Sequence, residues 1–190
     1  MPRIVDHEAR RRELTEALWR VVSRDGVEAV SVRNVAAEAG CSPGALRHYF
    51  PDQKDLITSA MSLVSERVTA RIRALRPSGS TLENAQAHCE QLIPLDAERR
   101  FEASVWFGFV NRARLDPELE ELTNGVHRDL RAFLAGLVRA MGLDESETGG
   151  LHALIDGLSM HLLLYPGQVG PREVRERLRA YLERLLRDAP

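Results

Sequence analysis

The chain has 190 residues, a net charge of −2 and 44% hydrophobic residues, which indicates one or two small globular domains and excludes disordered and fibrous proteins. The charge balance also excludes a strong attraction of the whole protein to nucleic acid. No apolar run is long enough for a membrane span, and none follows the charged N-terminus, so we expect neither a membrane partner nor a signal peptide. Two isolated cysteines, Cys41 and Cys89, favour the reducing cytoplasm.

Apolar residues recur at helical spacing almost everywhere, and no run of residues alternates with a period of two. The sequence therefore predicts an all-α fold of nine helices in two layers. We expect three short helices up to residue 50, then a long connecting helix over 56–75, and then a bundle of five helices. The five are expected over residues 82–93, 97–115, 118–141, 145–165 and 172–187.

Two of the short helices are predicted to form a helix-turn-helix between residues 31 and 50. Ser31 and Ser42 are placed to cap the first turns of the two helices, and Pro43 suits the first helical position of the second. Gly40 lies at the junction, where the chain needs a left-handed backbone conformation. The second helix of such a motif enters the DNA major groove, so the motif points to DNA binding.

The segment SVRNVAAEAGCSPGALRHYF over residues 31–50, followed by Lys54 and Leu56, resembles the TetR family of bacterial transcriptional regulators. The resemblance implies a helix-turn-helix DNA-binding domain over residues 1–53. It also implies an effector-binding and dimerisation domain over residues 54–190. Residues 154–158 are in addition similar to the penultimate helix of the choline-responsive repressors of this family.

The resemblance also implies which residues meet DNA. Ser31, Arg33, Tyr49 and Lys54 would contact phosphate, with a packed aromatic as the alternative for Tyr49. Lys54 is the chain's only lysine and falls in the first turn of a helix, where the dipole disfavours a cation unless an external anion offsets the cost. Arg47 stands where the family most often has tyrosine, and it can bind phosphate or read guanine. Residues 42–45, the first turn of the recognition helix, would meet base edges. The full expected DNA-binding set is Ser31, Arg33, Ser42, Pro43, Gly44, Ala45, Arg47, His48, Tyr49 and Lys54.

The last predicted helix carries one apolar stripe, and the helix before it carries apolar residues on two sides, which suggests packing against the chain's own core and against a second copy. In the family these helices build a four-helix dimer interface, so the resemblance implies a homodimer that reads two half-sites of one operator. The expected dimer residues are Leu151, Leu154, Ile155, Leu158, Leu162, Val174, Leu178, Tyr181, Leu182 and Leu185.

The helix expected around residues 101–115 is the most aromatic part of the chain and is apolar nearly all round, which places it in the middle of the bundle. Pockets in helical bundles are apolar with a few converging polar groups, and the family's C-terminal domains bind small effectors. For each candidate, ordinary packing or exposure is the alternative, and the few inward charges favour an apolar or aromatic ligand. The candidates are His88, Cys89, Trp106, Phe109, Asn111, His127, Met160 and His161.

Motifs of catalysis and metal binding are missing from the sequence. His152 and Asp156 lie one helical turn apart, but no third ligand occurs at a matching spacing, so no metal ion or other cofactor is expected. There is no phosphate-binding glycine loop, zinc-protease motif or nucleophile elbow. Neighbours such as His88 and Cys89 point about 100° apart on a helix, which is wrong for a nucleophile and its base. The chain is therefore not expected to be an enzyme.

Together these features predict a cytoplasmic, homodimeric repressor that a small molecule releases from a palindromic operator in double-stranded DNA. Two alternatives stay open. The first is an activator or a co-repressor-dependent regulator, which needs its ligand in order to bind DNA. The second is a helical dimer that carries small molecules or binds proteins and does not bind DNA.

Overall fold

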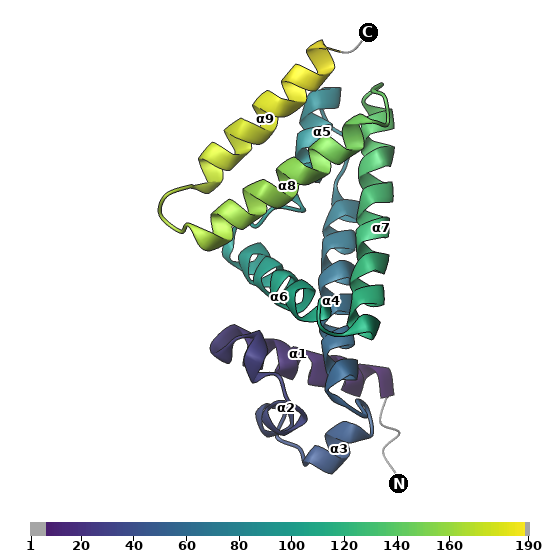
Figure 1. Ribbon diagram of the computed structural model, residues 1–190, viewed down its shortest axis with the longest axis vertical. Helices are drawn as coiled ribbons and strands as arrows, with labels where there is room; N and C mark the ends of the chain where they lie inside the picture. Colours follow the sequence, from purple (N-terminus) through teal and green to yellow (C-terminus); the bar gives the residue numbers. More distant parts are fainter. Residues whose placement is uncertain (1–6, 189–190) are drawn as a thin grey trace. The chain divides into compact units, whose positions relative to one another are not determined.

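The computed structural model describes residues 7–188. In that range the chain forms nine α-helices, one short 3₁₀-helix and no strand, so the predicted all-α fold is confirmed (Figure 1). None of these helices is both long enough and apolar enough to cross a membrane. The elements are α1 (His7–Asp25), η1 (Val27–Ala29), α2 (Val32–Glu38), α3 (Pro43–Arg47), α4 (Gln53–Ala74), α5 (Thr81–Glu90), α6 (Ala97–Ala113), α7 (Pro117–Ala140), α8 (Glu147–Leu164) and α9 (Pro171–Arg187).

Two helix lengths in the first part of the chain differ from the prediction. α1 has 19 residues and is not short, because no helix breaker interrupts its apolar stripe. α3 ends at Arg47 and does not reach residue 50. The Leu46 carbonyl accepts hydrogen bonds from the amides of both Tyr49 and Phe50, which tightens the chain into a turn before Pro51.

The described chain divides into two compact units. The first comprises the residues up to Ser65 together with Val105–Leu122, and the second comprises Glu66–Ser104 together with the residues from Thr123 onward. α4, α6 and α7 therefore contribute residues to both units. The functional boundary expected after residue 53 stays a prediction.

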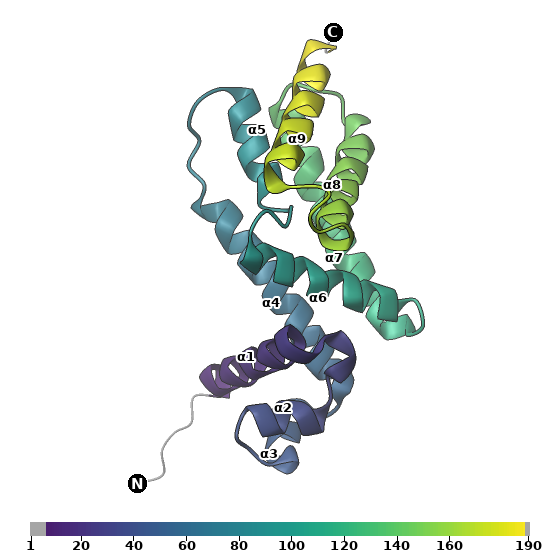
Figure 2. The same ribbon diagram turned by 90° about the vertical axis from the view of Figure 1, so that its left-hand side faces the viewer.

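The first unit is built around the apolar face of α1. Leu18 of α1, Leu46 of α3 and Phe50 are all fully buried, so the two bulky residues of the predicted recognition helix are core residues, as expected. Figure 2 shows α1 lying across α2 and α3. Gly108 of α6 approaches η1 so closely that a Cβ atom there would lie 2.7 Å from the Val27 side chain, so this packing requires glycine.

The second unit is a helical bundle in which α5 and α8 both pack against α9 (Figure 1). Its core is mainly apolar and includes a buried ion pair between α4 and α6. The Arg71 guanidinium donates to both carboxylate oxygens of Glu102, at 2.9 and 2.6 Å, and Glu102 is only 2% exposed. This two-point contact fixes the end of α4 against α6 within the unit.

Candidate nucleic-acid interface

Local capping builds the two helices of the motif as the sequence predicts. The Ser31 hydroxyl accepts a hydrogen bond from the Asn34 amide, and the Ser42 hydroxyl accepts one from the Ala45 amide, each at 3.1 Å. Pro43 occupies the first turn of α3. Gly40, with φ of +64°, turns the chain between α2 and α3 in the left-handed region that favours glycine.

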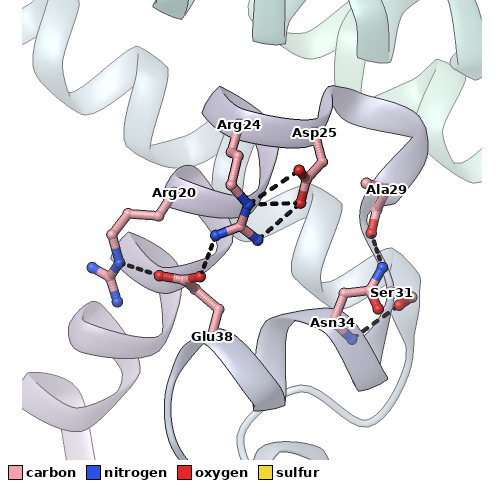
Figure 3. A network of polar contacts seen from close by, with 7 residues as sticks. All are labelled: Arg20, Arg24, Asp25, Ala29, Ser31, Asn34 and Glu38. Atoms are coloured by element: carbon pink, nitrogen blue, oxygen red, sulfur yellow. Dashed lines mark hydrogen bonds and ion pairs between the residues drawn. The ribbon is translucent and has the colours of Figure 1, made fainter.

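A network of polar contacts holds α2 against α1 (Figure 3). The Glu38 carboxylate of α2 accepts from Arg20 Nε and from Arg24 Nη1 of α1, both at 2.8 Å. These hydrogen bonds, from Arg24 and then Arg20, lower the pKa of Glu38. At the other end of α2, Asn34 Nδ2 donates to the Ala29 carbonyl at 2.8 Å. The tilt of α2, and with it the placement of α3, therefore depends partly on Glu38, which sequence reasoning missed.

The face of α3 opposite the buried Leu46 side chain is open to solvent. Leu46 points into the core, whereas the first turn of α3 is exposed from Ser42 to Ala45. At Gly44 an added Cβ would meet only the Ser42 hydroxyl, at 3.9 Å, so the backbone of α3 is accessible there. Of the predicted DNA-binding set, three residues are half-buried (Ser31, Tyr49 and Lys54), and seven are exposed (Arg33, Ser42, Pro43, Gly44, Ala45, Arg47 and His48).

Tyr49 lies in a cluster of rings at the end of α3. Its ring centroid is 4.5 Å from that of His7 on α1 and 5.4 Å from that of His48. Arg11 of α1 places its guanidinium 4.8 Å from the centroid of the Phe50 ring and donates to the Tyr49 carbonyl. Tyr49 is thus both packed and partly accessible, so its two interpretations stay open. His7 was not singled out from the sequence.

Lys54 makes an ion pair with Glu118, which lies in the first turn of α7 and belongs to the same unit. The side chain of Lys54 remains 38% exposed and that of Glu118 69% exposed. The sequence led us to expect an external anion near Lys54, but the anion beside it here comes from the chain itself. No local pattern joins Glu118 to the helix-turn-helix, so this partner could not be found from the sequence.

Most residues expected at the dimer interface are covered by the chain itself. Only Leu154 and Tyr181 of the ten are half-buried. The other eight belong to the core of the second unit and are at most 8% exposed: Leu151, Ile155, Leu158, Leu162, Val174, Leu178, Leu182 and Leu185. This corrects the assignment of those eight, because a side chain already covered by its own chain has almost no surface left for a second copy.

The expected ligand residues lie in different surroundings. Trp106 is half-buried, Phe109 is fully buried and Asn111 is exposed, all on the part of α6 in the first unit. Cys89 of α5 lies in the core of the second unit, where burial raises the pKa of its thiol to about 12. It is therefore an inert core residue and not an accessible ligand group. The remaining four candidates are in the second unit: His88 and Met160 are half-buried, and His127 and His161 are exposed.

His127 of α7 stacks on the buried ring of His152 of α8, with ring centroids 4.9 Å apart and planes 30° from parallel. His152 Nε2 is 3.6 Å from the carboxylate of Asp156. Desolvation raises the pKa of Asp156, although both histidines oppose that shift. Stacked rings do not aim their nitrogen atoms at one point. In residues 7–188, moreover, no group of three or more His, Cys, Asp or Glu side chains is arranged to hold a metal ion.

A cavity of about 490 Å³ lies in the second unit between α5 and α7. Of the expected ligand residues, only His88 lines it. α5 also contributes Asn84, and α7 contributes Phe133 and Gly136. The His88 and Phe133 rings lie near each other in its lining, with centroids 6.3 Å apart and planes tilted by 37°.

Comparison with known proteins matches both parts of the chain. Residues 14–60 match the family model described as bacterial regulatory proteins, tetR family. Residues 81–187 match the model described as BetI-type transcriptional repressor, C-terminal. The HTH-type transcriptional regulator PksA of Bacillus subtilis is 36% identical over 194 aligned residues, which cover 96% of this chain and 93% of that protein.

Solved structures agree with the sequence matches. A transcriptional regulator from Rhodococcus sp. Rha1 superposes with a TM-score of 0.83 at 28% identity, covering 94% of this chain and 97% of that one. A regulator from Saccharomonospora viridis, solved in complex with choline, superposes with a TM-score of 0.79 at 24% identity, covering 93% of this chain and 96% of that one. The second likeness shows the fold alone.

Proposed function

The chain belongs to the TetR family of bacterial transcriptional regulators, and from that premise we propose that it is a homodimeric repressor that a small molecule releases from a palindromic operator. Its relatives regulate transcription, so the chain is a DNA-binding regulator and not an enzyme. The observation that carries the DNA-binding part is the exposed first turn of α3 above the buried Leu46. A regulator of this kind works in the cytoplasm, where the bacterial chromosome lies.

In this proposal the first turn of α3 enters the major groove, and the residues around it fix the protein on the backbone of the duplex. Ser42, Pro43, Gly44 and Ala45 meet base edges, and Arg47 reads guanine or binds phosphate. The flanking contacts position the helix without reading sequence. They come from Ser31, Arg33, His48, Tyr49 and Lys54.

A second copy packs against the exposed faces of α8 and α9. Ala153, Gly157, Met160 and Leu164 recur along one side of α8 at helical spacing, and Leu164 is 57% exposed. Small residues there let two helices approach closely. Residues 1–53 then serve as the reading head and residues 54–190 as the effector-binding and dimerisation part, and two-fold symmetry presents two reading heads to two half-sites.

The effector acts through α4, which has residues in both units. At its start, the Gln53 side chain donates to the Val30 carbonyl beside the helix-turn-helix. Near its end, Arg71 holds Glu102. A ligand that prefers one placement of α4 changes the separation of the two reading heads. It shifts the equilibrium only by its difference in affinity for the two states.

Choline is a natural first effector to try, because a structural neighbour was solved with it and the C-terminal part is of the BetI type. The decisive experiment is a DNase footprint of the purified chain on its own upstream DNA, at near-physiological salt because affinity depends steeply on salt. A protected inverted repeat supports the proposal.

The same footprint separates the alternatives. If adding an effector removes the protection, the protein is a repressor of the proposed kind. If the protection appears only when the effector is present, the protein is an activator or a co-repressor-dependent regulator. No protection with or without ligand, together with retained ligand binding, would favour the carrier dimer. Analytical ultracentrifugation of the same sample tests the dimer, and a monomer at footprinting concentrations contradicts it.

A further inference from the structure

The cavity between α5 and α7 is partly open to solvent and is large enough to hold a small molecule. Its volume of about 490 Å³ falls in the roughly 300–1,000 Å³ range typical of ligand pockets. Phe133 and Leu137 of α7 supply apolar walls, and Gly136 between them leaves an opening: a Cβ atom added there would meet nothing within 4 Å. The volume above Gly136 is therefore unfilled by the protein itself.

The polar groups of this cavity come from one face of α5. His88 Nδ1 lies 2.7 Å from the Asn84 main-chain carbonyl oxygen, which can only accept, so Nδ1 carries the hydrogen. Nε2 of the neutral ring is then a hydrogen-bond acceptor, and it has no partner in residues 7–188. Asn84 Oδ1 accepts from the Ser78 amide at 2.9 Å, which identifies the other side-chain atom as the NH₂ group. That group is a donor with no partner among the described residues.

Because His88 follows Asn84 by four residues, the free acceptor and the free donor lie one helical turn apart on the same face of α5. The cavity lining contains no Asp, Glu, Lys or Arg. A charged ligand would therefore lose hydration without gaining a counter-charge. An uncharged ligand with a donor and an acceptor side by side would satisfy both α5 groups.

We propose that the α5–α7 cavity binds an uncharged, largely apolar molecule that carries a hydrogen-bond donor beside an acceptor, such as an aromatic amide. The claim that this ligand is an effector rests on the proposed regulatory function. The claim that the cavity binds it does not. The preference for an uncharged ligand separates this site from one for a quaternary ammonium such as choline. A cation of that kind needs a carboxylate or several aromatic faces, and Phe133 is the only Phe, Tyr or Trp in the lining.

The test compares two ligands of the same shape and different charge. Benzamide is neutral, with a carbonyl beside an NH₂ group, whereas benzamidinium places a positive charge in the same position. Calorimetry or ligand-observed NMR on the full chain without DNA should show benzamide binding. Benzamidinium should bind more weakly by roughly tenfold or more, since its charge has no partner in the cavity. Choline should bind no better than benzamidinium at this site.

Two variants on α7 locate the binding. Gly136→Leu places a side chain in the opening, where its Cβ atom meets nothing within 4 Å, and it should abolish benzamide binding. Gly125→Leu is the matched control on the same helix, where a Cβ meets only the end of the Arg128 side chain, at 3.8 Å. Both changes raise helix propensity, so both should maintain or raise thermal stability, but only the first should remove the ligand.

Asn84→Asp gives the sharpest outcome. The new carboxylate still accepts from the Ser78 amide, but its other oxygen replaces the donor with a negative charge. The preference should therefore reverse, with benzamidinium binding more tightly than benzamide. The inference is overturned if Gly136→Leu binds benzamide like the wild type, if neither probe binds the wild type, or if Asn84→Asp leaves the preference unchanged. The footprint reports separately on the regulator: a wild type that binds benzamide but no DNA refutes the proposed function and leaves the cavity intact.

Discussion

Ion pairs hold helices together in both compact units, but one pair of the second unit, between Arg71 and Glu102, is far less exposed than the pairs that join α1 to α2 in the first unit. In the first unit, which contains the helix-turn-helix, the side chains of Arg20 and Arg24 are 54% and 60% exposed where they meet Glu38. In the second unit, the Arg71 side chain is 25% exposed, and the Glu102 side chain that it meets is 3% exposed, against 19% for Glu38. The first kind of pair is screened by salt and open to competing ions, whereas the second is screened much less.

The difference suits the tasks that the proposed function assigns to the two units. A surface that binds phosphate needs cations whose partners can be exchanged, and the exposed pair of Lys54 with Glu118 is one of this kind. A bundle that transmits a ligand's effect to a long helix needs a contact that does not yield to solvent ions, and the two hydrogen bonds from Arg71 to Glu102 provide it. Breaking each kind of pair should therefore affect different properties.

The largest effect should come from the buried pair. Arg71→Ala leaves the carboxylate of Glu102 in the core without its partner, which should lower the free energy of unfolding by about 3 kcal/mol, the lower end of the range for broken buried pairs because Arg71 is partly exposed. Urea denaturation measures it. Arg67→Ala is the matched control one turn earlier on α4, since its pair with Glu98 is exposed and 3.5 Å long. Equal losses in the two variants would contradict the distinction between buried and exposed pairs.

The next effect concerns DNA affinity and not stability. Tyr49→Ala combined with Lys54→Ala should weaken operator binding and reduce the salt slope by about 0.9 for each phosphate that the variant no longer neutralises, while the dimer persists. Binding isotherms at several salt concentrations measure both. Tyr49→Phe, which keeps the ring against His7 and removes the hydroxyl, separates phosphate binding from packing. A double variant that binds as tightly as the wild type would show that the phosphate assignment is wrong.

The sequence predicted more of the helix-turn-helix than of the bundle. The reason is that the helix-turn-helix depends on contacts between residues close together in sequence, whereas the bundle depends on contacts between distant helices. Ser31, Ser42, Pro43 and Gly40 act within a few residues of themselves, so their roles follow from local spacing. The bundle was predicted as helices, but whether a residue such as Ile155 faces the core or a second copy depends on how distant helices pack.

The dependence of the bundle on contacts between distant helices explains where the sequence predictions differ from the structure. An apolar stripe such as the one on α9 fits the core and an interface equally well in sequence, and the structure puts it in the core. Cys89 and Asn111 looked alike as candidate ligand residues, yet one is buried and the other exposed. Glu118 escaped notice because only the fold brings it to Lys54.

A smaller effect should follow from releasing Lys54. Glu118→Gln removes the anion that competes with phosphate, so operator affinity should rise a few-fold, in line with the roughly 0.2–1 kcal/mol of an exposed pair. The salt slope should steepen, because Lys54 becomes fully available to the backbone. In a Lys54→Ala background the same change should have no effect. An equal gain in that background would mean that Glu118 acts through the general field of the unit and not through Lys54.

The smallest effect on stability should come from the network around Glu38. The direction of its pH dependence follows from the shift in the pKa of Glu38. Hydrogen bonds from Arg24 and Arg20 lower the pKa of Glu38 in the folded chain. Its contribution is therefore present above the unfolded pKa of about 4.3 and is lost as the pH falls through the lower folded pKa. Glu38→Gln should lower Tm at neutral pH by less than Arg71→Ala does, and the difference in Tm between the variant and the wild type should close in acid and in high salt.

A difference in Tm that persists under both conditions would mean that Glu38 packs α2 by its shape and not by its charge. The network would then resemble the buried pair of the second unit, and the contrast between the two units would fail.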